Sequence, residues 1–306
     1  MKIVFLEPLG LSLEKIEKEC DNLVKQGHDV VIYNDRCPEK NIERAKDADV
    51  VVESNMPLRK DFLEACPNLK MLSIAFTGLD HIDLEECKKR GIIVNNAAGY
   101  STEAVAEEVI CMMIGLYRHV IENDNVTRSC RGIALSPGRE IFNKTVGIVG
   151  LGAIGQRIAK ILQAFGCKVI AWNRTHKDVE GVTLVDKETL FKEADIVTLN
   201  VALNEDTRNF VSARELSLMK KSAIIINAAR GPVVNNNDLA EALKNGDIAG
   251  AALDVYDIEP PLDGDNPIFS APNTMLLPHI GFATEEAFEL RLGIVVRNIE
   301  NFCSKS

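Results

Sequence analysis

Closely spaced cysteines are missing from this sequence. The eight cysteines are dispersed, with no CxxC and no close pair, at positions 20, 37, 66, 87, 111, 130, 167 and 303. Such spacing suits neither a disulfide framework nor a cysteine-based zinc site. We therefore expect reduced thiols that pack mostly as small hydrophobic side chains, as in a cytoplasmic protein, and no bound metal.

Long apolar runs are missing as well. No uninterrupted stretch approaches the roughly 20 apolar residues of a membrane-spanning helix. The apolar run at the start stops at Glu7 and Pro8 and is too short for the core of a signal peptide. The formal net charge of −10 disfavours nucleic acid or an anionic membrane as a partner. These features predict a cytoplasmic protein that binds neither.

The first hundred residues alternate apolar runs with polar helical patterns. The expected strands are KIVFLE, DVVIYN, DVVVESN, LKMLSIAF and GIIVNNA, and the clearest helices are LEKIEKECDNLVKQG and DLEECKKRG. Apolar strands without alternation, separated by helices, are typical of a parallel sheet covered on both faces. This part of the chain is therefore predicted to form a doubly wound α/β domain.

A second series of the same kind fills most of the remaining chain. An apolar helix is expected over residues 103–120, an irregular polar stretch over 121–143, and a last helix over 284–303. The strands of this series are TVGIVG, KVIAWN, DIVTLNV, SAIIINAA, AGAALDV and TMLLP. The 306 residues suffice for about two cores, so the fold class is α/β with two doubly wound parallel sheets.

Residues 150–155 (GLGAIG) form a GxGxxG pattern between an apolar strand and an amphipathic helix. In such a βαβ unit, Gly150 makes the tight turn and Gly152 lets the backbone approach a pyrophosphate. Gly155 lets the helix pack close to the strand, so that the helix N-terminus faces the phosphates. The residues predicted to contact a dinucleotide here are Gly150, Gly152, Ala153, Ile154 and Gly155.

The second strand of this unit ends in an unusual sequence. An acid at that place binds the ribose 2′-hydroxyl of NAD and repels the 2′-phosphate of NADP. Here Asn173, Arg174 and Thr175 follow the strand, and the nearest acid is Asp178. The turn is either a solvated basic turn or a 2′-phosphate site. We favour the second interpretation, with NADP(H) as cofactor and NAD(H) as the other possibility.

Hydride transfer to a carbonyl needs a proton donor that works near neutral pH, and histidine is the usual choice. Five histidines are present. His28 lies in a turn before a strand, His119 lies late on an apolar helix, and His176 is at the adenine end of the site. His81 follows an expected strand and is a competitor. His279 directly follows TMLLP, where ligands of open α/β sheets bind, and is our candidate.

Two neighbouring strands end in charged residues. Arg230 directly follows the apolar run SAIIINAA, and AGAALDVYDIEPP brings Asp254 and Glu259. Arginine offers a planar fork for a carboxylate. A glutamate beside a histidine favours the charged imidazolium and orients the ring. Arg230, Glu259 and His279 together predict a site that reduces a 2-oxo acid.

At this point the sequence resembles the D-isomer-specific 2-hydroxyacid dehydrogenases over nearly its whole length. The matching segments are AFTGLDHIDLEECKKRGIIVNNAAGYSTEAVAE, KTVGIVGLGAIG, INAARGPVVNNNDLAEAL, GAALDVYDIEPP and LLPHIGFAT. The resemblance implies that Arg230, Glu259 and His279 form the catalytic set. It also implies cofactor contacts by Val201, Ala202, Thr207, Ala228, Ala229 and Asp254. The family usually has proline where this chain has Ala202.

The resemblance further implies a layout of two domains. A flavodoxin-like substrate domain (residues 1–98 and 283–306) flanks a Rossmann dinucleotide-binding domain (residues 99–282), with the substrate in the cleft between them. It implies a homodimer formed through residues 103–120 and 121–143. Substrate contacts are then expected from Ser54, Asn55, Met56, Phe76, Thr77, Gly78, Leu79, Tyr100 and Arg230.

The expected substrates are small 2-oxo acids and D-2-hydroxy acids, such as glyoxylate, hydroxypyruvate or D-lactate-like compounds. Phe76 and Tyr100 suggest a partly apolar pocket without a fixed cation, which makes phosphoglycerate less attractive. Two alternatives stay open: a phosphoglycerate dehydrogenase without a regulatory domain, and a dinucleotide-sensing binding protein of the corepressor kind. A formate dehydrogenase is disfavoured, because those relatives have glutamine in place of Glu259.

Overall fold

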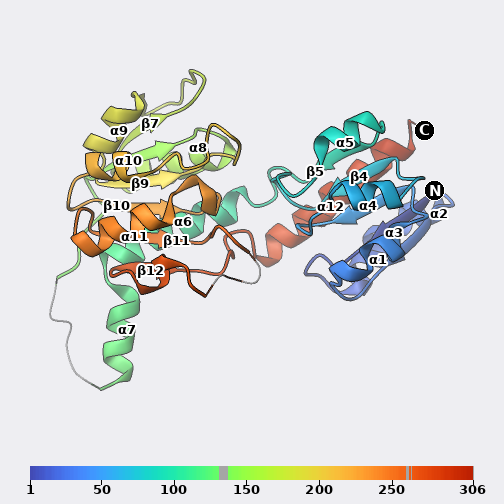
Figure 1. Cartoon of the computed structure of the whole chain (residues 1–306), viewed down its shortest axis with the longest axis horizontal. Helices are drawn as coiled ribbons and strands as arrows, with labels where there is room; N and C mark the ends of the chain where they lie inside the picture. The colour runs from blue at the N-terminus through green and yellow to red at the C-terminus, as the bar shows by residue number, and fades with distance from the viewer. Residues whose placement is uncertain (131–136, 260–261, 263, 306) are drawn as a thin grey trace. The chain divides into compact units, whose positions relative to one another are not determined.

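The chain folds into two compact units. The computed structural model describes residues 1–130, 137–259, 262 and 264–305 (Figure 1). Unit 1 consists of residues 1–101 and 283–306, and unit 2 consists of residues 102–282. The sequence placed the two crossings near residues 99 and 283. Each unit has its own sheet and is described by itself.

Unit 1 is built on a five-stranded parallel sheet in the order β2-β1-β3-β4-β5. Its strands are β1 (Lys2–Phe5), β2 (Asp29–Ile32), β3 (Val50–Glu53), β4 (Met71–Ile74) and β5 (Ile93–Asn96). Its helices are α1 (Leu13–Glu19), α2 (Asp21–Lys25), α3 (Asn41–Ala45), α4 (Lys60–Ala65), α5 (Leu84–Lys89) and α12 (Glu285–Cys303), with the 3₁₀ helix η1 (Pro38–Lys40). The strand order reverses between β1 and β3, where open α/β sheets bind ligands.

The final helix, α12, belongs to the unit formed by the first hundred residues. It begins at the cap Thr284, whose side chain accepts a hydrogen bond from the amide of Ala287. Its buried face includes Arg291, which is 3% exposed. The guanidinium of Arg291 donates to the carbonyls of Leu9 and Ala75. The helix therefore fixes the segments that follow β1 and β4.

Unit 2 contains a seven-stranded parallel sheet in the order β12-β11-β10-β9-β6-β7-β8. Its strands are β6 (Thr145–Val149), β7 (Lys168–Trp172), β8 (Val182–Leu184), β9 (Ile196–Leu199), β10 (Ile224–Asn227), β11 (Gly250–Leu253) and β12 (Thr274–Leu276). Its helices are α6 (Thr102–Tyr117), α7 (Val120–Arg128), α8 (Ala153–Ala164), α9 (Lys187–Glu193), α10 (Ala213–Leu218) and α11 (Asn236–Asn245), with η2 (Gly231–Val233) and η3 (Pro267–Ser270). The order reverses between β6 and β9.

Apolar side chains fill both faces of the unit 2 sheet. One core cluster joins the strands to α9, α10 and α11, and includes Leu190, Leu216 and Leu239. The other joins them to α6 and α8, and includes Val109 and Ile158. Strands β9 and β10 are buried at nearly every position, as the non-alternating apolar runs predict. The doubly wound α/β class is confirmed for both units.

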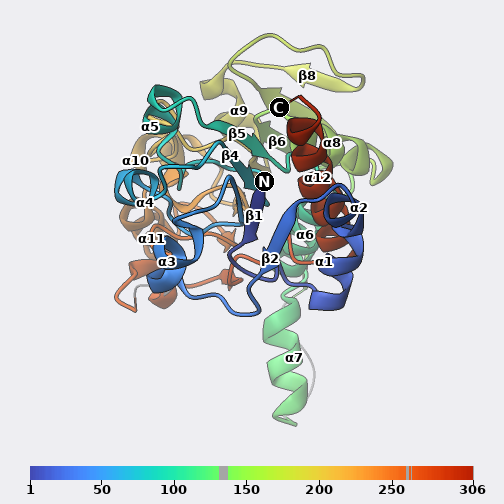
Figure 2. The ribbon, with the colours of Figure 1, turned by 90° about the vertical axis from the view of Figure 1, so that its right-hand side faces the viewer.

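The structure differs from the sequence expectation at three places in the helices. The helix expected over LEKIEKECDNLVKQG is divided at Cys20 into α1 and α2. His119, expected late on a helix, instead lies between α6 and α7 with φ of +51°. Residues 120–128 of the stretch expected to be irregular form α7, which extends away from the rest of unit 2 in both views (Figures 1 and 2). Residues 131–136 lie outside the described residues.

Within the described residues, no helix is both long and apolar enough to cross a membrane. The same residues contain no group of three or more histidine, cysteine, aspartate or glutamate side chains placed to hold a metal ion.

Candidate active site and cofactor site

Two glycines shape the loop between β6 and α8. Gly150 has φ of +96°, which L side chains rarely adopt, and a Cβ there would lie 2.6 Å from the carbonyl oxygen of Asn200. A Cβ on Gly155 would lie 2.1 Å from the carbonyl oxygen of Gly150. Close packing thus requires glycine at both positions, as the sequence pattern predicts.

Gly152 differs from Gly150 and Gly155 in the space around it. It is the N-cap residue of α8 with φ of −67°, and a Cβ on it would meet no protein atom within 4 Å. The protein itself therefore does not need glycine here, whereas a group approaching the backbone from outside would. Ala153 and Ile154 form the first turn of α8, whose free amides suit an anion. This geometry fits a dinucleotide pyrophosphate.

A pocket of about 230 Å³ opens beside this loop. It lies at the carboxyl ends of β6, β7 and β9, where the strand order reverses. Its lining residues are Gly150, Gly152, Trp172, Asn173, Arg174, Asn200, Val201, Ala202, Asn204, Asp206, Thr207 and Phe210. The sequence interpretation had not named Trp172, Asn200, Asn204, Asp206 and Phe210, although their positions at or after strand ends could have indicated them.

Asn173 binds the glycine loop. Its Oδ1 accepts a hydrogen bond of 2.9 Å from the amide of Leu151, and its Nδ2 donates to the carbonyl of Thr175 at 2.8 Å. Lys177 Nζ donates to the carbonyl of Leu151 at 3.1 Å. The sequence analysis expects Asn173 to be a residue of the cofactor site. In the structure both of its ends are engaged within the protein, so its main effect is to fix the loop.

Arg174 lines the pocket and is exposed. The described residues contain no ion pair between Arg174 and an acid. The nearby Asp178 contacts His176 Nε2 at 3.0 Å. Thr175 is also exposed at this turn. The turn therefore presents a cation beside the pocket where an acid is expected in an NAD site.

The predicted residues after β9 lie in one loop. Val201 and Ala202 line the pocket, and Thr207 closes the loop by donating from Oγ1 to the carbonyl of Ala202 at 2.7 Å. Asp206 also lines this pocket from the same loop. Ala228 and Ala229 lie at the end of β10, where the amide of Ala229 donates to Asn227. They are outside the residues that line this pocket.

The charged candidates follow three adjacent strands. In the sheet register Asn227 of β10 pairs with Leu253 of β11, which pairs with Leu276 of β12. Neighbouring strands lie about 4.8 Å apart, so the segments after these residues emerge side by side. Arg230, Asp254 and His279 begin those segments. Three residues that are distant in the sequence are therefore brought to one edge of unit 2.

His279 is bonded to Glu259 in a close contact between Nδ1 and Oε2. The second carboxylate oxygen of Glu259 accepts a hydrogen bond from the amide of Tyr256. The two side chains are 21% and 18% exposed, so both remain accessible. His279 has φ of +58°, a left-handed conformation that is costly for a residue with a Cβ. Glu259 therefore fixes the orientation of the ring through Nδ1.

Arg230 is placed by its own loop. The side chain of Asn227 donates to the carbonyl of Arg230 at 2.9 Å and accepts from the amide of Ala229 at 3.1 Å. A Cβ on Gly231 would lie 2.0 Å from the carbonyl carbon of Tyr256. The segment carrying Arg230 therefore packs directly on the segment that leads to Glu259.

Asp254 has a role that the sequence interpretation did not anticipate. It is 1% exposed, and its Oδ1 and Oδ2 accept hydrogen bonds of 2.8 Å from the amides of Ile280 and Gly281. These amides directly follow His279. The carboxylate that is expected to contact the cofactor thus holds the backbone of the histidine segment.

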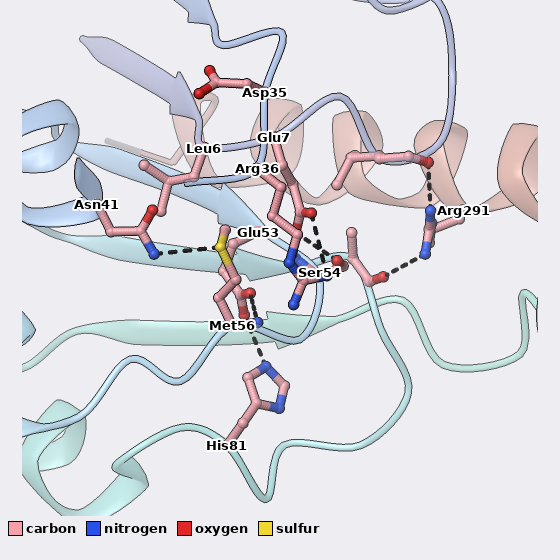
Figure 3. Close-up of polar contacts among 12 residues, drawn as sticks. Leu6, Glu7, Asp35, Arg36, Asn41, Glu53, Ser54, Met56, His81 and Arg291 are labelled. Atoms are coloured by element: carbon pink, nitrogen blue, oxygen red, sulfur yellow. Dashed lines mark hydrogen bonds and ion pairs between the residues drawn. The ribbon is translucent and has the colours of Figure 1, made fainter. Parts of the chain in front are cut away.

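In unit 1, polar side chains meet after β1 and β3 (Figure 3). Ser54 donates from its amide at 2.9 Å and from its hydroxyl at 2.5 Å to Oε1 of Glu7. Arg36 approaches the other oxygen of Glu7 at 3.7 Å. His81, the competing candidate base, contacts the fully buried Glu53 at 2.8 Å. Burial raises the pKa of the Glu53 carboxyl, and the contact with His81 opposes this effect.

The other predicted substrate residues occupy the same carboxyl edge of unit 1. Phe76 and Tyr100 lie with ring centroids 6.4 Å apart, and both are buried. Asn55, Thr77, Gly78 and Leu79 are at least partly exposed. Met56 is fully buried, with Asn41 donating to its sulfur. The backbone amide of Met56 is also engaged, donating to Oε2 of Glu53 at 2.6 Å. The expected substrate contact at Met56 therefore stays a prediction.

Comparisons with known proteins show which family this chain is similar to. The family described as "D-isomer specific 2-hydroxyacid dehydrogenase, NAD binding domain" matches residues 110–281. Glyoxylate reductase of Thermococcus litoralis is 36% identical, over 97% of this chain and 94% of its own. Glycerate dehydrogenase of Methylorubrum extorquens is 38% identical, over 87% of this chain and 86% of its own. The chain belongs to the D-isomer specific 2-hydroxyacid dehydrogenase family.

The dehydrogenase also resembles solved structures. An acyclic imino acid reductase, determined with NADPH and D-Arg, superposes with a TM-score of 0.90 at 31% identity, covering 100% of this chain and 98% of that one. The chain is therefore an NAD(P)-dependent oxidoreductase of 2-hydroxy acids, with the NAD-binding match inside unit 2. Neither alternative, the corepressor-like binding protein or the phosphoglycerate dehydrogenase without a regulatory domain, gains support.

We predict that Gly152→Ala weakens cofactor binding about 10-fold or more while changing the free energy of unfolding by less than about 0.5 kcal/mol. The added methyl meets open space in the protein but occupies the path of the pyrophosphate. Isothermal titration with NADPH and urea unfolding measure the two effects. Gly150→Ala is the contrasting variant, because positive φ and contact with Asn200 should also destabilise the fold. Unchanged affinity in Gly152→Ala would place the phosphates elsewhere.

Proposed function

We propose that this dehydrogenase reduces small 2-oxo acids without a charged side chain to 2-hydroxy acids, which have the D configuration where C2 is chiral. Glyoxylate and hydroxypyruvate are the leading candidate substrates. Support comes from the similarity to a glyoxylate reductase and a glycerate dehydrogenase. The apolar pair Phe76 and Tyr100 in unit 1 also favours a substrate without a phosphate. D-lactate-like substrates fit the same chemistry.

The contact between His279 and Glu259 is the observation that carries the proposal. Because Glu259 binds Nδ1 and favours the charged ring, Nε2 of His279 can donate a proton. Arg230 offers a guanidinium to the substrate carboxylate. When bound, a reduced nicotinamide cofactor supplies a hydride to C2 of the 2-oxo acid. His279 then protonates the developing alkoxide, and Glu259 stabilises the imidazolium before that transfer.

Unit 2 would hold the cofactor, Arg230 and His279, and unit 1 would supply the other substrate contacts. Gly150, Gly152 and the first turn of α8 would receive the pyrophosphate, and Val201, Ala202 and Thr207 would lie along the adenosine. For the cofactor we propose NADPH over NADH. Arg174 faces the pocket without an acidic partner among the described residues, and residues 173–177, directly after β7, include no acid to repel a 2′-phosphate. Asp206, in the loop after β9, is not at the ribose position of such a unit.

The homodimer and the cytoplasmic location stay predictions. The dimer expected through residues 103–143 is consistent with α7, which contains no buried residue. Val120 and Ile121 are 51% and 48% exposed at its start. An exposed apolar pair at the start of a helix without buried residues is a natural contact for a second subunit.

Turnover with a panel of 2-oxo acids tests the function. We expect NADPH oxidation with glyoxylate or hydroxypyruvate, and a loss of about 10³-fold or more in kcat/KM for Arg230→Gln, because a charge-assisted carboxylate contact is removed. Arg214→Gln, at an exposed arginine of α10, is the matched control and should behave as wild type. Near-normal turnover of Arg230→Gln on the best substrate would refute the role of Arg230.

The pH dependence of reduction tests the pairing of Glu259 with His279. The rate should fall as pH rises, since the ring must be protonated to donate. In Glu259→Gln this falling limb should move to lower pH, because the charge that favours imidazolium is lost. The measurement is kcat/KM against pH at constant ionic strength. A limb that stays in place would show that Glu259 is not the partner of the catalytic histidine.

The cofactor preference is tested by a double change. Two opposite charges at a partly exposed site should give wild type a preference for NADPH of ~10- to 100-fold. Asn173→Asp with Arg174→Ile should reverse it, mainly through KM for NADPH, because the contact is remote from the hydride. Aspartate can still accept the hydrogen bond from Leu151. The two single variants serve as controls, and a wild-type ratio of kcat/KM that favours NADH would overturn the proposal.

A further inference from the structure

A buried carboxyl group lies behind the backbone of the histidine segment. Glu108 extends from α6, and its Oε2 is buried with no hydrogen-bond donor reaching it from the described residues. A Cβ built on Gly281 would lie 2.3 Å from this oxygen and 3.1 Å from Oδ2 of Asp254. Two carboxyl groups therefore meet directly against the glycine that is two residues beyond His279.

The two groups differ in the donors around them. Asp254 accepts hydrogen bonds from the amides of Ile280 and Gly281 and lies in the field of His279, all of which favour its charged form. Glu108 has no such support. Burial, together with the neighbouring Asp254, raises the pKa of Glu108 to about 8. Burial also raises the pKa of Asp254, against the opposing effect of the two amides. At neutral pH the proton of the pair therefore resides on Glu108.

We propose that Glu108 is a positioning residue for the reaction: its protonated carboxyl donates to Asp254 and so fixes the carboxylate that holds the backbone after His279. The proposal rests on the proposed role of His279 as proton donor. Helix α6 then contributes Glu108 to the support of the active site and also covers one face of the sheet.

The pair offsets the strain of the histidine segment. His279 adopts a left-handed conformation, which is unfavourable for a residue with a Cβ. It persists because Asp254 binds the following amides and Glu259 binds the ring. If Glu108 loses its proton, two adjacent carboxylates repel each other and the hold on these amides weakens.

Other charged or titratable groups face the pair from the surrounding elements. His279 and Glu259 lie in the segments after β12 and β11, and the pKa of Tyr256 is raised to about 12, by burial first and then by Asp254 and Glu259. On α6, Glu103 is paired with Arg157 of α8 at 2.6 Å. Among these groups Glu108 is the one whose pKa lies near 8, so its ionisation can be followed separately.

The first test is thermal unfolding of the full chain, without cofactor, between pH 6 and pH 9. Because the pKa of Glu108 is raised on folding to about 8, its contribution to stability is present at low pH and is lost as pH rises toward that value. Glu108→Gln keeps a donor for Asp254 but does not titrate. We expect the Tm of wild type to fall relative to that of Glu108→Gln by about 5 °C over this range.

Glu107→Gln is the matched control. Glu107 is the adjacent residue of α6 and is exposed, so its variant should follow the wild-type curve. If the curves of wild type and Glu108→Gln run parallel from pH 6 to pH 9, the carboxyl pair does not hold a proton at neutral pH and the proposal fails.

The second test asks whether the pair acts on His279. The ring is followed by NMR in protein labelled at histidine Cε1, with the signal assigned by its absence in His279→Asn. In wild type the chemical shift of this signal should change as Glu108 ionises near pH 8, and in Glu108→Gln this change should be missing. The absence of a change near pH 8 in wild type, or its persistence in Glu108→Gln, would overturn the positioning role. Neither test measures turnover. A failure of the proposed 2-oxo acid reductase activity can therefore be distinguished from a failure of the proposed role of Glu108.

Discussion

The two hydrogen bonds from the amides of Ile280 and Gly281 to Asp254 are the interaction on which the active site depends. A parallel sheet brings the ends of β10, β11 and β12 together, but it does not orient the side chains that follow. Asp254 does so for the histidine segment, because a buried carboxylate with two backbone donors allows few alternative arrangements. The sheet thus provides proximity, and the carboxylate provides orientation.

In the cofactor site, too, the sheet brings segments together and hydrogen bonds orient them. The reversal of strand order between β6 and β9 opens a crevice, and Gly150 and Gly155 shape its floor by contacts that exclude any Cβ. Asn173 and Lys177 then bond to the backbone of Leu151 from the next strand end. Loop geometry, rather than charge alone, therefore prepares this unit for a dinucleotide.

Features encoded locally could be predicted from the sequence. The strands of both sheets are non-alternating apolar runs. The spacing of the three glycines in residues 150–155 predicts a phosphate-binding loop. Features that depend on distant partners could not be predicted. Glu108 looks like an ordinary polar residue of a helix until Asp254 and Gly281 are placed beside it. Helix α7 was expected to be irregular because none of its residues is buried, so hydrophobic periodicity gives no signal there.

The bonds of Asn173 have a consequence for how such enzymes can change over evolutionary time. Its Oδ1 holds the glycine loop, and only its Nδ2 bonds within the turn after β7. An aspartate at this position would retain the first bond and lose the second. A lineage could thus move between an amide and an acid at this strand end by a single substitution without passing through a protein with a broken phosphate loop. Cofactor usage in this fold can therefore drift while the scaffold that binds the common pyrophosphate stays intact.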